Sequence, residues 1–430
     1  MKKIIVAGCG HGGLSAAANL AKNGFDVTVI EKKKREELGY DWCDSMRKST
    51  FEKADIPLPD LSVFSPTQRK TYSNPKRSVR LEIPKSNSGN IVFVDRKFLI
   101  GYLIDYAVKC SVKFIFDCEV LSALCTEDGV CGVVAVKNGV ETEYEAQLVV
   151  DAAGINSPVR KSLPPSFGIE SEIKSENTFG VWRGYFESRE KLSEGEYDIY
   201  FYHMNRPGMD WVIKNDGYCD VLVGAFGALC ENDVKTALDD FYAIYPEMSD
   251  KLIRGGSFEK IPLGKTLPLF VCDGCALVGD SASMTEPLSG SGLDMSIIAG
   301  RMLAETVTEC DDMKKETLWK YNLRFFREHT EKHYSDTAVK NFLSGVSAED
   351  VDFLFEKKLM TEKEITGGAR VSYSPAEIAQ KAAVITRPKL LLSLFGLLKR
   401  LNAAKKAKKL MPEKYDEKAI EKFKKVYSKL

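Results

Sequence analysis

No stretch of this sequence approaches the roughly 20 consecutive apolar residues that a membrane-spanning helix needs. The apolar run behind the first lysines ends at Ala7, where glycines interrupt it, so it is too short for a signal peptide. A net charge is missing as well, because 61 lysines and arginines balance 61 acidic residues. These absences predict a soluble protein that does not bind nucleic acid.

The eleven cysteines lack the even count and regular spacing of a disulfide framework, so we expect a reducing, cytoplasmic location. Cys272 and Cys275 form a CxxC pair with no second pair, and they bracket Asp273-Gly274, which is typical of a turn. His329 and His333 stand four residues apart on an expected helix, without the glutamate of a zinc hydrolase. We therefore expect these histidines on a solvated face, and no metal site.

The sequence does contain a dense glycine pattern near its start, in MKKIIVAGCGHGGLSAAANLAKNGFDVTVIE. Lys3 to Ala7 has the apolar, β-branched character of a buried parallel strand, and Gly12 to Asn23 has helical spacing. Asp26 to Glu31 is typical of a second strand that ends in an acid. Together they predict a βαβ unit of the dinucleotide-binding type.

Each glycine of the GxGxxG pattern has a physical task in such a unit. Gly8 allows the tight turn, Gly10 lets the backbone approach a pyrophosphate, and Gly13, next to Gly12, lets the helix pack closely on the strand. The helix N-terminus carries about half a positive charge and presents free amides to the phosphates. Glu31 is placed to accept hydrogen bonds from the adenosine ribose hydroxyls.

Two later stretches narrow the choice of cofactor. Residues 148–160 read LVVDAAGINSPVR, an apolar strand ending in Asp151 and followed by small residues, a serine and an arginine. Residues 276–300 read ALVGDSASMTEPLSGSGLDMSIIAG, a strand that closes at Gly279-Asp280 and leads to a second glycine-rich helix start. With these motifs the chain resembles, over roughly residues 1–330, the FAD-dependent hydroxylases, halogenases and geranylgeranyl reductases, which share the fold of para-hydroxybenzoate hydroxylase.

The resemblance implies FAD as the cofactor. Asp280 would bind its ribityl hydroxyls, and the amides of the helix opening at Gly292 would stabilise negative charge near the pyrimidine edge of a reduced flavin. Arg96, in VDRKFLIGYLIDYA, matches an arginine or glutamine that opens a helix near the phosphates and ribityl chain. The expected cofactor contacts of the third motif are Asp280, Pro287, Gly290, Gly292, Leu293 and Asp294.

The resemblance also implies an α/β fold with a discontinuous, Rossmann-like FAD-binding domain and an inserted substrate domain. The FAD-binding domain would comprise residues 1–60, 91–165 and 265–335. The substrate domain would comprise residues 61–90 and 166–264, where YDIYFYHMNRPGMDWVI and GYCDVLVGAFG have the period-two pattern of an antiparallel sheet. Residues 336–430 are predicted to form a helical C-terminal region, with breaks at Pro375 and Pro388.

Branches of this family differ in the residues near the flavin. Hydroxylases usually carry Asp-Gly in the middle motif, where this chain has Ala153-Gly154, which disfavours a hydroxylase. Geranylgeranyl reductases carry aromatic-x-Trp-x-Phe-Pro and halogenases Trp-x-Trp-x-Ile-Pro, and MDWVIK fits both at Trp211 but departs from both at Met209 and Lys214. Trp211 is expected to wall a dry pocket beside the flavin, and an ordinary core position in the sheet is the alternative.

A second distinguishing segment is DWCDSMRKSTFEKADIP, which aligns at Cys43 with a Cys-Gly-Glu-type segment of geranylgeranyl reductases. The acid comes one residue early, at Asp44, and the glycines are absent. A cysteine near the flavin could donate a proton to the carbon opposite the hydride, or shape the pocket. A plain packing role for Cys43 stays open beside these catalytic interpretations.

The C-terminal 44 residues, 387–430, are strongly basic, with fourteen Lys or Arg against four acids, which gives +10 and leaves −10 on the rest of the chain. Within them LLLSLFGLLKRL is a short apolar block followed by AKKAKK. Such a block suits a membrane interface with lysines on anionic headgroups. A basic helix packed on the body of the protein is the alternative.

These features predict an FAD-dependent oxidoreductase similar to geranylgeranyl reductases, which reduces carbon–carbon double bonds of an isoprenoid or other hydrophobic substrate by hydride transfer from flavin N5. NAD(P)H, reduced ferredoxin or another carrier protein could supply the electrons. A flavin-dependent monooxygenase or halogenase is one alternative, and a non-catalytic FAD-binding membrane or partner module is another. The tail would place the protein at the inner face of the membrane if it binds lipid.

Overall fold

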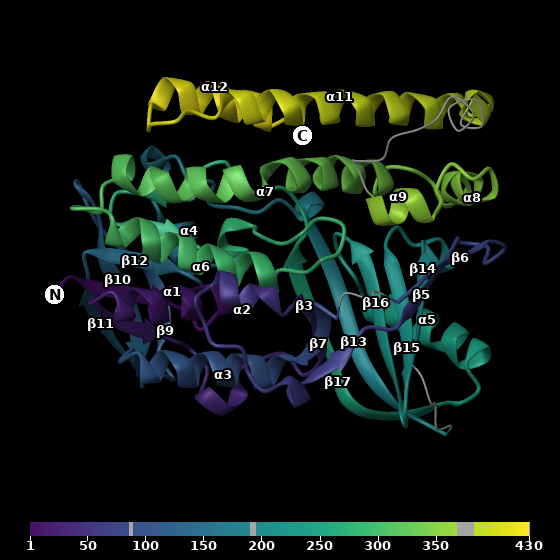
Figure 1. Ribbon diagram of the computed structural model, residues 1–430, viewed down its shortest axis with the longest axis horizontal. Helices are drawn as coiled ribbons and strands as arrows, with labels where there is room; N and C mark the ends of the chain where they lie inside the picture. Colours follow the sequence, from purple (N-terminus) through teal and green to yellow (C-terminus); the bar gives the residue numbers. More distant parts are fainter. Residues whose placement is uncertain (86–88, 190–194, 368–381, 430) are drawn as a thin grey trace.

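The computed structural model describes residues 1–85, 89–189, 195–367 and 382–429 (Figure 1). Pro375, predicted to break the C-terminal helices, lies outside the described residues. A central six-stranded sheet has the order β18-β19-β12-β1-β2-β8, and all neighbouring strands are parallel except the pair β18 and β19. Its strands are β1 (Lys3–Ala7), β2 (Asp26–Ile30), β8 (Lys113–Ile115), β12 (Leu148–Asp151), β18 (Val271–Cys272) and β19 (Cys275–Leu277).

Three long helices pack beside this sheet. Helix α1 (His11–Lys22) follows β1 directly and contacts both α3 (Arg96–Lys109) and α6 (Leu293–Thr308). The two shorter helices are α2 (Ser49–Lys53) and α4 (Pro158–Ser162). A three-stranded antiparallel sheet of β9 (Glu119–Thr126), β10 (Gly129–Lys137) and β11 (Val140–Glu145) contacts β12 through β10. The predicted βαβ unit and α/β fold class are confirmed.

The second large element is a seven-stranded, mostly antiparallel sheet in the order β17-β13-β16-β15-β14-β5-β6 (Figure 1). Its strands are β5 (Arg69–Ser73), β6 (Arg80–Ile83), β13 (Thr178–Ser188), β14 (Glu196–Phe201), β15 (Met209–Asn215), β16 (Tyr218–Phe226) and β17 (Met248–Pro262). Alternate side chains of β13, β14, β15 and β16 pack on helix α5 (Glu231–Ile244). The remaining side chains of these strands face away from α5, and this second face carries Arg183, Tyr197 and Trp211 of the candidate site.

A small sheet of β3 (Cys43–Arg47), β7 (Ile91–Asp95) and β4 (Phe64–Pro66) connects the two large sheets. Val92 and Val94 of β7 belong to the core around the six-stranded sheet, whereas Phe93 packs with Tyr197 and Trp211 of the seven-stranded sheet. This alternation follows from the period-two geometry of a strand. The small sheet therefore holds the cofactor-side core and the second face of the large sheet together.

The C-terminal helices are α7 (Lys315–Leu343), α8 (Ala348–Glu356), α9 (Glu362–Gly367), α11 (Pro388–Leu410) and α12 (Glu417–Tyr427). Figure 1 shows α11 and α12 along one edge of the molecule, and α11 contacts both α12 and α7. Among the described residues, no helix is both long enough and apolar enough to cross a bilayer. The division into domains at the predicted boundaries stays a prediction.

Candidate functional site

The glycine turn between β1 and α1 is tightly packed. Gly8 has φ +95°, in the left-handed region that favours glycine, and its amide donates to Ile30 O at 2.8 Å. A Cβ on Gly13 would lie 2.4 Å from the Ala152 Cβ, so the helix approaches the end of β12 more closely than a side chain permits. Gly12 is similarly close to α6, and Gly10 is the N-cap of α1.

Glu31 lies directly after β2 and turns its carboxylate back toward the glycine turn. Oε2 accepts from the Cys9 amide at 2.7 Å, and Oε1 accepts from the Lys33 amide at 2.9 Å. The side chain is buried. Each carboxylate oxygen has further lone-pair capacity, so the position suits the ribose hydroxyls predicted to bind there.

Arg96 brings the first and third motifs together. It opens α3 as predicted, but Asp95 caps this helix by accepting from the Phe98 amide at 2.8 Å. Burial raises the pKa of the half-buried Asp280 carboxyl, and the Arg96 charge partly offsets this rise; the Arg96 charge also acts on His11 at the start of α1. Asp95, and not Arg96, is therefore the cap of this helix.

Two buried nitrogens in this cluster lack a hydrogen-bond partner among the described residues: Nε of Arg96 and Nε2 of His11. Burial, and secondarily the Arg96 charge, keep the pKa of His11 well below its ordinary value. Unpaired polar nitrogens in a buried position are costly unless a ligand satisfies them. Together with the glycine turn and the acceptor Glu31, they form a set of polar groups that fits the diphosphate and ribose of FAD.

In the third motif, the structure uses its acids in different ways. Asp280 accepts from Thr285 Oγ1 at 3.0 Å, within the short 3-10 turn Gly279–Ala282 and the loop that follows. Asp294 is engaged with β3 and α2 instead: its Oδ1 accepts from the Arg47 amide at 3.0 Å and from Thr50 Oγ1 at 2.7 Å, and its Oδ2 pairs with the Arg47 guanidinium. Asp294 thus ties α6 to the cysteine segment.

The remaining residues of the third motif surround the start of α6. Gly292 is the N-cap of α6 and Leu293 its first residue, as predicted. Pro287 and Gly290 lie in the preceding turn, which the Gly290 amide closes on Glu286 O at 2.9 Å. The cofactor roles of these four residues stay a proposal.

Cys43 is the first residue of β3, and it contacts the seven-stranded sheet. Its amide donates to the Tyr185 hydroxyl at 2.8 Å, and the Arg254 guanidinium donates to its sulfur at 3.9 Å. Burial raises the pKa of the thiol, and the Arg254 charge partly offsets this rise. The thiol is therefore protonated at neutral pH and has a cation beside it.

Asp44 connects this cysteine segment to both sides of the site. Its Oδ2 accepts from Arg96 at 2.6 Å, and its Oδ1 accepts from Arg183 of β13 at 2.9 Å. Arg183 is 2% exposed and also forms a two-pronged pair with Asp220 of β16, at 2.8 and 2.6 Å. Asp44, which comes one residue earlier than the acid of the family pattern, thus bridges Arg96, predicted to lie near the phosphates, and Arg183 of the large sheet.

Trp211 lies on the second face of the large sheet, within this same group. The Arg183 guanidinium stands 5.3 Å from its ring centre, and the Tyr197 ring packs against it edge-on at 5.7 Å. Its indole Nε1 is buried without a partner among the described residues. Arg183 therefore contacts the Trp211 ring and pairs with Asp44, the residue next to Cys43.

Sequence reasoning missed the residues that join these parts: Arg183, Tyr185, Asp220 and Arg254. A signal for two of them exists, since Arg183 and Asp220 interrupt the otherwise apolar strands TFGVWRGYFES and YCDVLVGAF. Charged residues in the middle of buried strands are rare unless paired. Their pairing depends on the register of β13 against β16, which the sequence does not display.

The expectation for the two α7 histidines is wrong. His333 is buried, and its Nε2 accepts from the Thr266 amide at 3.1 Å. Burial lowers the pKa of His333 to about 3 and that of His329 to about 4. The helix turns this face toward the core instead of toward solvent. Cys272 and Cys275 do bracket a turn, between β18 and β19.

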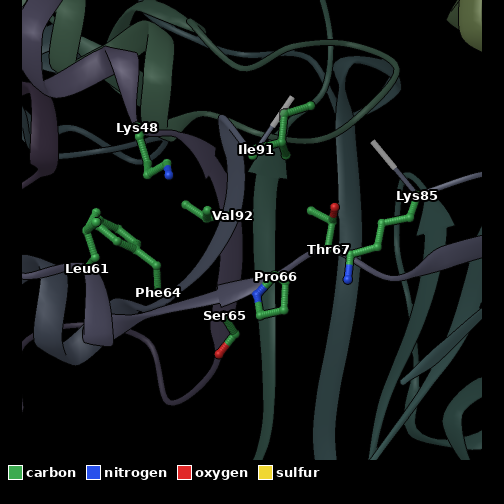
Figure 2. Close-up of a pocket in the computed structure, with 10 residues that line it drawn as sticks. Lys48, Leu61, Phe64, Ser65, Pro66, Thr67, Lys85, Ile91 and Val92 are labelled. Atoms are coloured by element: carbon green, nitrogen blue, oxygen red, sulfur yellow. The ribbon is translucent and has the colours of Figure 1, made fainter. Parts of the chain in front are cut away.

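A pocket of about 240 Å³ lies apart from this group, beside β4 and β7. Figure 2 shows Lys48 and Lys85 at either end of its lining, with Val92 and Pro66 between them. None of its lining residues belongs to the predicted site.

Comparison with known proteins adds three findings. A sequence model described as "FAD binding domain" matches residues 1–216. A digeranylgeranylglycerophospholipid reductase of Sulfolobus acidocaldarius is 23% identical over 94% of this chain and 91% of its own length. A second reductase of that name, from Methanococcoides burtonii, is 27% identical over 74% of this chain and 78% of its own length.

Solved structures share the fold. A geranylgeranyl bacteriochlorophyll reductase-like protein of Thermoplasma acidophilum has a TM-score of 0.73 at 20% identity, covering 92% of this chain and 99% of that one. A flavin-dependent brominase has a TM-score of 0.63 at 16% identity, covering 90% of this chain and 100% of that one.

Proposed function

Because this chain belongs to the FAD binding domain family, whose model covers half of it, we propose that it is an FAD-dependent reductase of carbon–carbon double bonds in isoprenoid lipids. The observation that carries the proposal is the bridge from Arg96 through Asp44 to Arg183, with Trp211 against Arg183 and Cys43 next to Asp44 in the chain. The names of the relatives, which are reductases of an isoprenoid glycerophospholipid, support it.

FAD would be held by the glycine turn, Glu31, Arg96 and Asp280, and it supplies a hydride for one carbon of a double bond when bound. The chain itself must supply the proton for the neighbouring carbon. The Cys43 thiol suits this task because burial raises its pKa and keeps the proton on sulfur. Arg254, beside that sulfur, would stabilise the thiolate left after proton transfer.

Trp211 and its neighbours would shape the space for the substrate. Tyr197, Ile199 and Ile213 form one apolar cluster with it, and Phe179, Val181 and Leu222 form a second. An isoprenoid chain would be removed from water when it packs against these side chains. The same packing would keep water, and therefore competing solvent protons, away from the reacting carbons.

The test of the reaction is anaerobic. We would reduce the FAD-loaded protein with dithionite, add polyprenyl lipids and follow the flavin absorbance together with the lipid mass. Reoxidation by lipid without oxygen, with a product two mass units heavier, is expected. Reoxidation only after air is admitted would contradict the proposal and favour the monooxygenase or halogenase alternative.

The role of Cys43 is tested by Cys43→Ala. General acid catalysis contributes about 10²–10⁴-fold, so we expect double-bond reduction to slow by at least about 100-fold while FAD content is retained. Cys125→Ala, on β9 of the small antiparallel sheet, is the matched control and should react as wild type does. Wild-type turnover by the Cys43 variant would remove this residue from the mechanism.

We also propose that α11 contacts the membrane from which a lipid substrate would come. Leu392, Phe395 and Leu398 are 70%, 58% and 55% exposed, and their spacing of three residues places them along one side of the helix. Lys389 and Lys399 lie exposed at the two ends of this stripe. Exposed apolar residues flanked by lysines suit the interface of an anionic bilayer.

The anaerobic assay, repeated with candidate donors in place of dithionite, identifies the electron donor. The same assay tests the non-catalytic alternative, which predicts that FAD binds and no lipid is reduced.

A further inference from the structure

The ammonium group of Lys70 lies against aromatic side chains and has no acidic partner among the described residues. It lies on β5 opposite Tyr197 of β14, and its Nζ stands 5.2 Å from the centre of the Tyr197 ring. Burial lowers the pKa of Lys70, and no nearby carboxylate acts against this shift. Lys70 is half-buried, and even partial desolvation of a charge that has no paired anion is costly.

Two tyrosines neighbour Lys70 on this face of the sheet. Tyr72 is two residues after Lys70 on the same face of β5, and Tyr197 and Tyr72 are close enough for each charge to influence the other. Burial raises the pKa of Tyr72 to about 12, so its hydroxyl keeps its proton. Among the described residues, no hydrogen-bond partner is found for the Lys70 ammonium, the Tyr72 hydroxyl or the Tyr197 hydroxyl.

This group adjoins the candidate active site. The Tyr197 ring contacts the Trp211 ring at 5.7 Å, and the charges of Arg183 and Asp44 act on the Tyr197 hydroxyl. A ligand bound at Lys70 would therefore extend past Tyr197 toward Trp211. The cluster of Tyr72, Phe93, Tyr197, Ile199 and Trp211 would cover the apolar part of such a ligand.

We propose that Lys70, Tyr72 and Tyr197 form a subsite for the phosphate group of the isoprenoid substrate, an assignment that rests on the proposed function and specifies its substrate class. One ammonium and two phenolic donors match the acceptor-only oxygens of a phosphate. The aromatic neighbours match the isoprenoid chain attached to it. A phosphate held here would fix which double bonds reach the position beside Cys43 and Trp211.

The test measures binding to the FAD-loaded protein, with farnesyl phosphate, farnesol and inorganic phosphate as probes and tryptophan fluorescence as the readout. Hydrogen bonds to charged groups contribute enough to expect farnesyl phosphate to bind at least about tenfold more tightly than farnesol. Lys70→Met should abolish this preference, and Lys70→Arg should retain most of it. Lys251→Met, on an exposed lysine of β17 paired with Glu187, is the matched control and should keep it fully.

Several outcomes would overturn the assignment. Equal affinities of wild type for farnesyl phosphate and farnesol would do so, and so would an equal loss of both in Lys70→Met, which indicates a structural role. If inorganic phosphate binds as tightly as farnesyl phosphate, the subsite takes a free anion instead of a substrate group.

Failure of the proposed reaction gives a different result. If a Lys70-dependent preference for farnesyl phosphate is present while no lipid is reduced in the anaerobic assay, the subsite stands and the reductase proposal fails. If lipids are reduced while the preference is absent or independent of Lys70, the reductase proposal stands and the subsite fails.

Discussion

Arg183 carries a positive charge into the interior of the molecule, and two carboxylates make that possible. Its guanidinium pairs with Asp220 on the neighbouring strand and with Asp44 on the small sheet. Asp220 is 3% exposed, so neither partner of this pair has ready access to water. The loss of one of these charges would leave another charge buried without a partner and would destabilise the site.

Replacing Asp220 by Asn tests this charge balance. Removing one partner of a buried ion pair typically costs about 3–5 kcal/mol, and we expect Asp220→Asn to lower the free energy of unfolding in urea by about 3 kcal/mol. Asp216→Asn, in the exposed turn between β15 and β16, should change it by less than about 0.5 kcal/mol. Equal stability of the two variants would show that Asp44 alone compensates Arg183.

The contacts between individual site residues could not be predicted from the sequence. The sequence marks Cys43 and Trp211, but it gives no sign that Arg183 contacts the Trp211 ring and pairs with Asp44, the neighbour of Cys43. Asp44, noted only as a departure from the family pattern, bridges Arg183 and Arg96. Contacts of this kind depend on residues that are far apart in the chain, and no local pattern encodes them.

At the scale of single elements, α1 depends on how closely it approaches the strands beneath it. The Cβ of an alanine at 13 would stand 2.4 Å from Ala152 Cβ and 3.0 Å from Val6 Cγ1, within atoms that cannot easily move. Helix α3 gives the contrasting case, since a Cβ on Gly101 would meet nothing within 4 Å.

The pair Gly13→Ala and Gly101→Ala should therefore change stability in opposite directions. Overpacking at Gly13 is expected to cost about 1–3 kcal/mol and to lower the FAD content of the purified protein. Alanine at Gly101 should add up to about 1 kcal/mol, because glycine is a poor helix former. Urea unfolding and flavin absorbance measure both effects, and a stabilised Gly13 variant would refute the close packing.

Helix α7 has a pH-dependent contact where a solvated face was expected. His333 has a pKa lowered to about 3 in the folded protein, whereas the unfolded chain has the ordinary value of 6.5. Between these values the unfolded state binds more protons, so stability is full above pH 6.5 and falls as the pH drops toward 3.

Replacing His333 by Gln should flatten this dependence. Gln retains an acceptor for the Thr266 amide but does not titrate. One proton changes the free energy of unfolding by about 1.4 kcal/mol per pH unit, and the slope between pH 6 and pH 4 should decrease by up to that amount. An unchanged slope, measured by urea unfolding at each pH, would show that His333 is protonated or exposed in the folded state.

At the scale of the whole molecule, the basic tail and its exposed apolar residues lie on helices outside the candidate site. The last 44 residues carry +10 and the rest of the chain −10. Within the tail, Ile420, Phe423 and Tyr427 of α12 are buried in the main core, so this part is a packed helix. The exposed stripe of α11 is what remains available for a lipid surface.

We expect the protein to bind phosphatidylglycerol vesicles and to bind phosphatidylcholine vesicles more weakly. Each lysine near an anionic surface contributes about 1 kcal/mol, so the preference should decrease with added salt. Replacing Leu392, Phe395 and Leu398 together by Gln should weaken vesicle binding at least about tenfold. Val140→Gln, an exposed apolar residue on β11, is the control. Unchanged sedimentation of the triple variant would exclude α11 as the contact.

The amino-acid sequence alone determines the βαβ unit, its glycine turn and the membership of an FAD-binding family. These depend on short segments whose residues are neighbours in the chain, so their spacing is visible in the sequence. The helix starts at Arg96 and Leu293 and the strand end at Asp151 are equally local, and all three are found where predicted.

Only the tertiary structure decides which residues share the site and which face of a helix is buried. The bridge from Arg96 through Asp44 to Arg183, the burial of His333 and the position of Lys70 beside Tyr197 all depend on strand register and helix packing between distant segments. A side chain's charge is written in the sequence, but its partner is set by the packing that brings two remote backbones within a few ångströms.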